Sequence, residues 1–274
     1  MSLEITEAVL KRDRVIVVAG LATIIMLAWA YVIYLSSNMT GMAMNSGSGM
    51  DIHPAQMSMP NTHVWGSGDV IFTFLMWAVM MIAMMTPSAT PMILTFAHVS
   101  HQRYSGRAAF PTTIIFLLGY LLVWISFSAG ATFLQWGLHS AALLSPQMIS
   151  VSPPLGGIFL ILAGVYQFTP LKNKCLSRCR TPLGFLMTEW REGTKGALIM
   201  GVRHGIYCVG CCWLLMTLLF VAGVMNLVWV ALIALYVLVE KVIPAGQWLS
   251  RAIGLLTVGW GAWLLIQVWG MQPA

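Results

Sequence analysis

The chain has 274 residues, of which 59% are hydrophobic and 8% are charged. Soluble globular domains carry about 25% charged residues, so the composition excludes a soluble globule. The net charge of +6 does not indicate nucleic-acid binding, because the basic residues stand in short segments between apolar runs, where they set the orientation of a membrane protein. Since a membrane helix needs about 20 apolar residues, the chain is predicted to fold as an all-α polytopic transmembrane helix bundle.

The apolar runs predict about seven spans. The first run, Val15 to Leu35, follows charged residues and is longer than the core of a signal peptide, so residues 1–35 are interpreted as a cytoplasmic tail and a retained membrane anchor. Residues 69–274 are expected to form the rest of the bundle. Its predicted spans are 70–97, 110–136, 154–170, 205–224, 226–243 and 252–269.

The positions of lysine and arginine predict the orientation of the bundle. All 14 lie at the N-terminus or near ends of spans on the same side, whereas the connections 36–68, 137–153 and 224–227 contain none. Basic connections remain in the cytoplasm. We therefore expect the N-terminus inside and the C-terminus outside, in a bacterial inner (cytoplasmic) membrane, with the lipid bilayer as one partner.

The outward connection 36–68 is rich in methionine and histidine. Its Gly, Ser, Asn and Pro residues offer no core in which methionines would be buried. Thioethers are soft ligands that suit Cu(I), and imidazole binds copper or zinc. The loop is predicted to capture metal, the alternative being a methionine-tolerant surface that binds a partner. The candidate ligands are Met39, Met42, Met44, His53, Met57, Met59 and His63.

The second span contains a stripe of methionines in the sequence MWAVMMIAMMTPSATPM. Met76, Met80 and Met84 share an arc of about 80° on a helical wheel. Pro87 and Pro91 lack backbone donors and predict a kink that leaves carbonyls without partners. The stripe is interpreted either as a thioether path continuous with the outer loop or as ordinary core packing. Further candidate ligands at its inner end are His98 and His101.

All five cysteines fall near the predicted cytoplasmic edge, where thiols stay reduced and disulfides are not expected. One imidazole and three thiols share an arc of about 100° at the start of span five. Two further thiols stand in the predicted cytoplasmic loop 172–197, among cations that favour the metal-binding thiolate. The alternative is that the cysteines are small core residues. The candidate ligands are His204, Cys208, Cys211 and Cys212 in the span, and Cys175 and Cys179 in the loop.

Other features of the inner half predict structure rather than chemistry. The stretch from Thr181 to Gly205 is expected to form an interfacial helix that leads into the fifth span. Gly201 and Gly205 have a GxxxG spacing, which either allows close helix contact or arises by chance. Glu240 and Lys241 are expected to pair or to reach the interface. No motif typical of a hydrolase or a nucleotide-driven pump occurs, so we do not expect an enzyme.

The chain resembles a bacterial family of predicted metal-binding integral membrane proteins, a domain of unknown function. The resemblance rests on the motifs TPLKNKCLSRCRTP and HGIYCVGCCW, on the methionine stripe, and on the later segments GVMNLVW and VEKVIP. The resemblance covers roughly residues 70–260. It implies an integral membrane protein that binds metal, supports the six His and Cys ligands, and supplies no reaction.

The leading hypothesis is a copper-handling membrane protein. The outer loop would collect Cu(I), the methionine stripe would pass it on, and the thiols would receive it, since thiolates bind it more strongly than thioethers do. Zinc is the alternative metal. Two other functions stay open: a thiol-redox membrane protein that uses the CxxC of Cys208 and Cys211, and a metal-binding assembly subunit whose partners are other subunits of a membrane complex.

Overall fold

The computed structural model describes residues 2–45, 65–103, 109–141, 153–224, 226–243 and 246–270. Over these ranges the chain forms ten helices and no strand. The predicted all-α class is confirmed, and the long apolar helices agree with a polytopic bundle.

Three long helices form the N-terminal half: α1 (Ser2–Asn45), α2 (Ser67–Arg103) and α3 (Ala109–Ser140). Helix α1 continues past Leu35, where the first span was expected to end. As a result, the three methionines expected at the start of the outer loop lie on this helix instead: Met39, Met42 and Met44. The remaining candidate ligands of the outer loop lie outside the described residues: His53, Met57, Met59 and His63.

The fourth expected span, 154–170, corresponds to a bent pair of helices. Helices α4 (Pro153–Tyr166) and α5 (Pro170–Arg180) meet at 63°, and together they are long and apolar enough to cross a membrane. Helix α5 begins where the side chain of Thr169 accepts a hydrogen bond from the amide of Lys172. Pro170 takes the first helical position, where a missing amide costs nothing. The Thr169-Pro170 step therefore separates α4 from α5, which continues in a different direction.

Helix α6 (Pro182–Glu189) is short and precedes the long helix α7 (Gly193–Thr217). Where a loop was expected over 172–197, the structure has most of α5, all of α6 and the start of α7. The interfacial helix expected to lead into the fifth span is divided at Gly193, whose φ of 76° is rarely adopted by residues with a side chain.

Helix α8 (Leu219–Ala222) continues α7, and the chain then passes through α9 (Leu227–Val242) and α10 (Gly246–Gly270). Among the described residues, five helices are long and apolar enough to span a membrane, and the bent pair makes a sixth. The one expected span that is not among these, 226–243, corresponds to α9. Its 16 residues rise about 24 Å, which is short of the ~30 Å hydrocarbon core.

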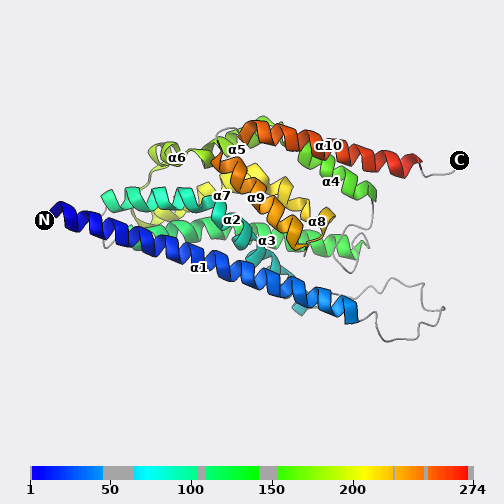
Figure 1. Cartoon of the computed structure of the whole chain (residues 1–274), viewed down its shortest axis with the longest axis horizontal. Coiled ribbons are helices and arrows are strands. Elements are labelled where there is room, and N and C mark those ends of the chain that lie inside the picture. Colours follow the sequence, from blue (N-terminus) through cyan, green and yellow to red (C-terminus); the bar gives the residue numbers. More distant parts are fainter. Residues whose placement is uncertain are drawn as a thin grey trace.

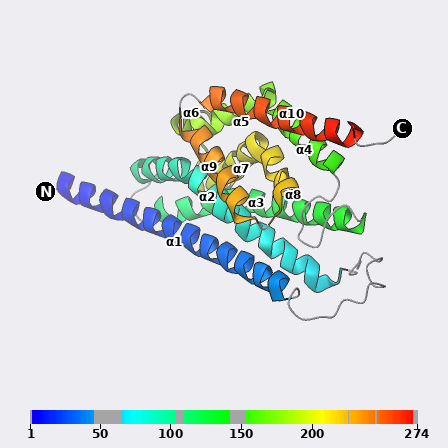
Figure 2. The same cartoon turned by 45° about the vertical axis from the view of Figure 1, so that its right-hand side comes forward.

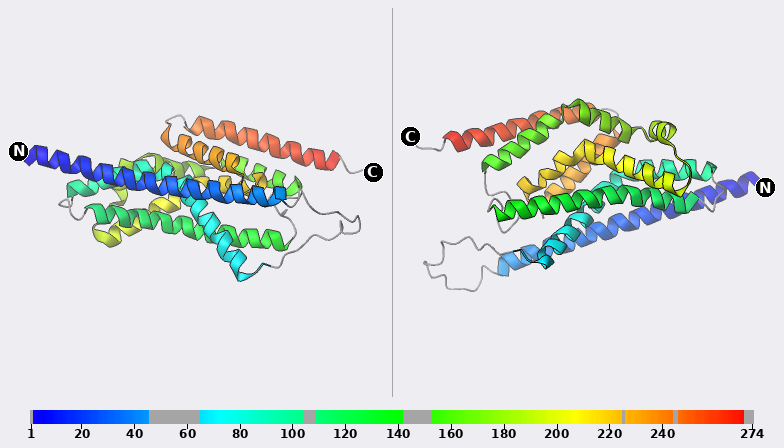
Figure 3. Two further views of the ribbon diagram at one scale, coloured as in Figure 1. Left: turned by 60° about the horizontal axis from the view of Figure 1, so that its bottom comes forward. Right: turned by 180° about the vertical axis from the view of Figure 1, so that it is seen from behind.

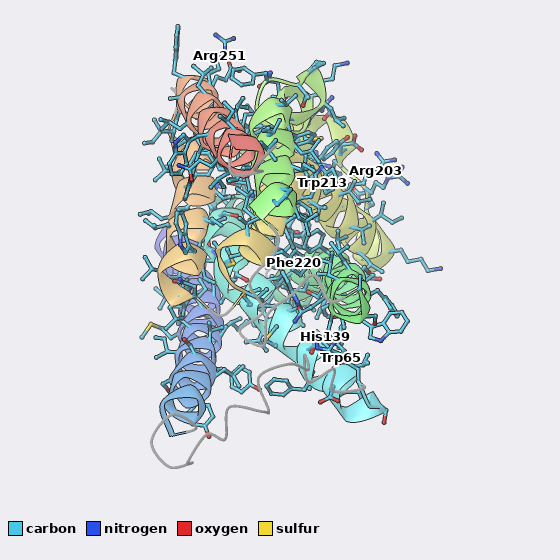
Figure 4. The ribbon with its side chains drawn as sticks, turned by 90° about the vertical axis from the view of Figure 1, so that its right-hand side faces the viewer. Trp65, His139, Arg203, Trp213, Phe220 and Arg251 are labelled. Carbon is cyan, nitrogen blue, oxygen red and sulfur yellow. The ribbon has the colours of Figure 1, made fainter. Side chains whose placement is uncertain are left out.

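Most helices run along the long axis of the bundle and are arranged in layers. The start of α1 and the end of α10 lie at opposite ends of the bundle (Figure 1). Helix α1 packs against α2 on one side and α10 packs along α4 on the other, with α3, α7 and α9 between these pairs (Figure 2). Seen along the bundle, Phe220 lies inside, whereas Arg203 and Arg251 lie at the periphery (Figure 4). Helix α7, which carries three of the five cysteines, is thus in the middle layer, whereas the methionine helix α2 belongs to the pair with α1.

Helix α2 is bent where it carries two prolines (Figure 3). Pro87 has no amide to offer the carbonyl of Ala83, one turn earlier. That carbonyl instead accepts a hydrogen bond from the indole of Trp29 on α1, at 3.2 Å. The carbonyl of Met85 accepts one from the hydroxyl of Tyr120 on α3, at 3.0 Å. The predicted kink is present, and α1 supplies a donor for the carbonyl that Pro87 leaves free.

Glycines allow α3 and α7 to approach closely. A Cβ atom added to Gly201 would collide with the carbonyl of Phe116, and one added to Gly205 would lie 2.9 Å from the Cβ of Val123. The GxxxG spacing is therefore used for helix contact rather than arising by chance. Helices α4 and α10 use the same device at Gly157 with Gly261 and at Gly164 with Gly254.

Replacing Gly201 with alanine is expected to destabilise the bundle. The new methyl group would meet main-chain atoms, which cannot rotate away, and overpacking of this kind costs about 1–3 kcal/mol. The matched control is Gly130→Ala on α3, because nothing lies within 4 Å of its added Cβ and alanine favours a helix. Thermal unfolding of both variants in detergent measures the difference. Equal melting temperatures would contradict the close α3–α7 contact.

Candidate metal centre

Helix α7 places three thiols together inside the bundle. Cys208, Cys211 and Cys212 are each at most 1% exposed. The thiols of Cys211 and Cys212 both donate to the carbonyl of Cys208 at 3.0 Å, as residues three and four positions later in a helix can. The Sγ atoms of all three also lie close enough to interact with one another. They form one cluster, on one helix face, as the spacing predicted.

The cluster lies deeper than expected. Cysteines were expected at the cytoplasmic edge, but α7 begins at Gly193, and Cys208 follows about 22 Å further along the helix axis. The difference arises because the segment taken for an interfacial helix is the first part of the membrane helix itself. The thiols are therefore surrounded by protein rather than by the aqueous boundary.

Helix α5 adds two further thiols. Cys179 is buried, and its thiol interacts with that of Cys211. Cys175 is half-buried and points at Gly210, where an added Cβ would lie 2.8 Å from its Sγ. All five cysteines are free. The two motifs that carry cysteine, distant in the sequence by about thirty residues, thus meet at the contact of α5 with α7.

We name the four thiols of Cys179, Cys208, Cys211 and Cys212 the thiol cluster. Soft thiolate donors suit Cu(I), so the chemistry of this set fits copper as cargo. In the part of the chain that the structure describes, no group of three or more His, Cys, Asp or Glu side chains is already arranged to hold a metal ion. The thiols of Cys211 and Cys212 are engaged in hydrogen bonds with the Cys208 carbonyl, which metal binding would replace.

Polar groups from three other helices surround Cys208. The ammonium of Lys241 on α9 donates to the Sγ of Cys208 at 2.9 Å and to the hydroxyl of Ser88 on α2 at 3.0 Å. The hydroxyl of Tyr120 on α3 lies 3.2 Å from the same Sγ. Cys208 is consequently the point where α2, α3, α7 and α9 are joined by hydrogen bonds.

His204 was expected to share the ligand face of the cysteines. Its ring is buried and stacks on Phe116 and Tyr120, with the edge of Phe185 on another side. The Nδ1 atom has no hydrogen-bond partner within the described residues. The aromatic rings of α3 and α6 therefore set the position of this imidazole, one turn before Cys208.

The methionine stripe of α2 is completely inside the protein. All its members are at most 2% exposed: Met76, Met80, Met81, Met84, Met85 and Met92. They belong to the same buried core as the thiol cluster. This burial agrees both with a thioether path and with packing.

The two histidines near the C-terminal end of α2 are more exposed than the thiol cluster. His98 is exposed, and its ring lies 3.1 Å from the side-chain amide of Gln102. His101 is half-buried and interacts with other groups of the protein. The exposed ring of His98 is thus apart from the buried thiols.

A second buried polar network lies beside the centre. The ammonium of Lys172 on α5 pairs with the carboxylate of Glu240 on α9 at 2.6 Å, and both side chains are at most 1% exposed. Gln167 accepts a hydrogen bond from the same ammonium, and Ser250 donates to the carboxylate. The expected pairing of Glu240 with Lys241 is wrong, because consecutive helix residues point in different directions.

Sequence reasoning missed the residues that hold the centre together: Lys241, Tyr120 and Ser88. A signal was available for the first of them. Lys241 stands near the end of an apolar run, and ionisable residues within membrane helices are functional candidates by default because their burial is costly. Nothing comparable marks a tyrosine or a serine, which are common in such helices.

Comparison with known proteins gives one match. Residues 74–264 match the model of a family described as "PpoB2: Copper chaperone". This range contains the methionine stripe, the thiol cluster, Lys241 and both halves of the buried ion pair. No curated protein and no solved structure gives a significant match.

Proposed function

The chain belongs to the PpoB2 copper chaperone family, and from that premise we propose that it binds Cu(I) at the thiol cluster inside a membrane helix bundle and delivers it at the bacterial inner membrane. The observation that carries the proposal is the convergence of the four thiols of α5 and α7 in the buried interior. Thiolates are the protein ligands that suit Cu(I) best among soft donors.

The methionine stripe is proposed as the route by which copper reaches the cluster. Two short connections link α2 to Cys208: Tyr120 contacts both the carbonyl of Met85 and the Sγ of Cys208, and Lys241 contacts both Ser88 and that Sγ. Weak thioether ligands would release copper to stronger thiolates. The transfer would then be directional without a nucleotide.

A thiol-redox function is the second candidate, and one observation favours it. The interaction between Cys179 and Cys211 brings together two thiols from different helices, as exchange chemistry requires. Burial argues against it, because a soluble partner must reach a thiol to exchange with it, and the thiols of the cluster are at most 8% exposed. Copper delivery therefore remains the preferred function.

Replacing Met76, Met80 and Met84 with leucine tests the thioether route. Leucine conserves volume, so each change should cost less than about 1.5 kcal/mol of stability. The expected result is a several-fold slower transfer of copper, because the thioether ligands are lost while the packing is kept. Vesicles that contain the protein and an internal Cu(I) chelator report the transfer.

The control for the leucine variant is Met187→Leu, because this side chain is 85% exposed and lies on α6. It should transfer copper at the unaltered rate. An unaltered rate in the triple leucine variant would mean that the stripe only packs. Copper would then reach the thiols by another route.

A further inference from the structure

Lys241 is a buried cation without a buried anion to match it. Among the described residues, the buried lysine and carboxylate side chains are Lys172, Glu240 and Lys241, and the first two form an ion pair. Lys241 is 7% exposed, and no carboxylate of the described chain lies within ion-pair distance of it. Its two hydrogen-bond partners are Ser88 and Cys208.

A buried ammonium needs an opposite charge nearby. Removing a charge from water costs several kcal/mol unless a counter-charge and hydrogen bonds compensate. A hydroxyl compensates only in part. The Sγ of Cys208, 2.9 Å away, is the one partner of Lys241 that can carry a negative charge. The ammonium is therefore placed to neutralise negative charge that develops on the thiol cluster.

Counting charges indicates how many thiolates the loaded cluster would contain. A Cu(I) ion with one thiolate has no net charge, with two it has −1, and with three it has −2. Adding the ammonium of Lys241 gives +1, 0 and −1 in these cases. Because the site is buried, the neutral arrangement is favoured.

On this basis we propose that Lys241 is the counter-ion of a two-thiolate Cu(I) complex at the thiol cluster, with Cys208 as one of the two ligands; this rests on the function proposed above. Two Cu–S bonds to thiolates form on loading, while the bonds between copper and the ligands that deliver it break. Each of the two ligand thiols that still carries a proton releases it to the solvent, and no electron is transferred. Lys241 does not bind copper and acts only through Cys208.

The position of Lys241 also gives the transfer a direction. Its ammonium lies between Ser88 on the methionine helix and Cys208 on the cysteine helix. Copper on neutral thioethers keeps its positive charge and is repelled by the ammonium, whereas the two-thiolate complex is negative and is attracted. The same charge therefore disfavours the state before transfer and favours the state after it.

The test compares Cu(I) affinity of full-length variants in detergent, by anaerobic competition with a colorimetric Cu(I) chelator. Lys241→Met removes the charge and keeps the length, and it is expected to weaken Cu(I) binding by about 100-fold. Lys241→Arg keeps the charge and is expected to stay within a few-fold of the unaltered chain. The matched control is Lys195→Met, because Lys195 lies on α7 but is exposed, and its affinity should not change.

An affinity of Lys241→Met equal to that of the unaltered chain would overturn the proposal. If that variant does not fold, copper X-ray absorption of the unaltered chain decides: two sulfur ligands support the counter-ion, and three or more contradict it. Failure of the proposed function looks different. In that case the unaltered chain itself does not bind Cu(I), or binds it equally well without the cysteines.

Discussion

A chain in which Cys208 and Cys211 are both replaced by serine is expected to lose high-affinity Cu(I) binding. The change removes two of the four thiols of the cluster, including the one held by Lys241 and the one that contacts α5. Hydroxyls are hard ligands that do not replace thiolates for Cu(I). The expected result is a fall from one bound copper per chain to none in anaerobic titration against a Cu(I) chelator.

A suitable control for the double variant is Cys175→Ser. This thiol is half-buried and packs on Gly210 beside the cluster. If the four-thiol cluster is the site, copper stoichiometry should survive the control and be lost in the double variant. Full binding in the double variant, with both proteins folded, would make the cysteines structural residues only.

Glu240→Gln is expected to destabilise the bundle strongly. It leaves the ammonium of Lys172 without its carboxylate, and both side chains are almost completely buried. Breaking a buried ion pair from one side costs about 3–5 kcal/mol, since an uncompensated charge remains. Unfolding in a denaturing detergent, followed by tryptophan fluorescence, measures the loss.

Two further variants identify the cause of that loss. Replacing both partners, as Lys172→Met with Glu240→Leu, removes the uncompensated charge and should recover much of the stability. Glu192→Gln breaks the exposed ion pair with Arg103, which should change stability by at most about 1 kcal/mol. A similar small effect at Glu240 would mean that the network tolerates a buried lone cation.

Local patterns in the sequence predicted those features that depend on one helix. Spacing along α7 placed three thiols on one face, and two prolines predicted the bend of α2. Hydropathy alone did not predict where helices begin within polar stretches. The segment 172–197 has many charges, yet Thr-Pro steps at 169 and 181 begin helices there.

Contacts between distant parts of the chain could not be predicted in the same way. Lys241 meets Ser88 across 153 positions and Cys208 across 33, and no local periodicity reports such pairs. His204 has the direction that a helical wheel gives, but the rings that enclose it come from α3 and α6. A wheel predicts the face of a side chain and not its neighbours.

The hydrogen bond from Trp29 to the carbonyl of Ala83 makes a residue of α1 necessary because of a residue of α2. The carbonyl lacks its usual donor only because residue 87 is proline, and an unpaired carbonyl within a membrane bundle costs several kcal/mol. A mutation that restored an amide at 87 would give the Ala83 carbonyl its own donor again, so the indole at 29 would no longer be needed. Loss of the indole alone would leave that carbonyl unpaired. Helix α1 lies before the stretch that matches the family, at 74–264. Its Trp29 is nevertheless required by Pro87, which lies inside that stretch.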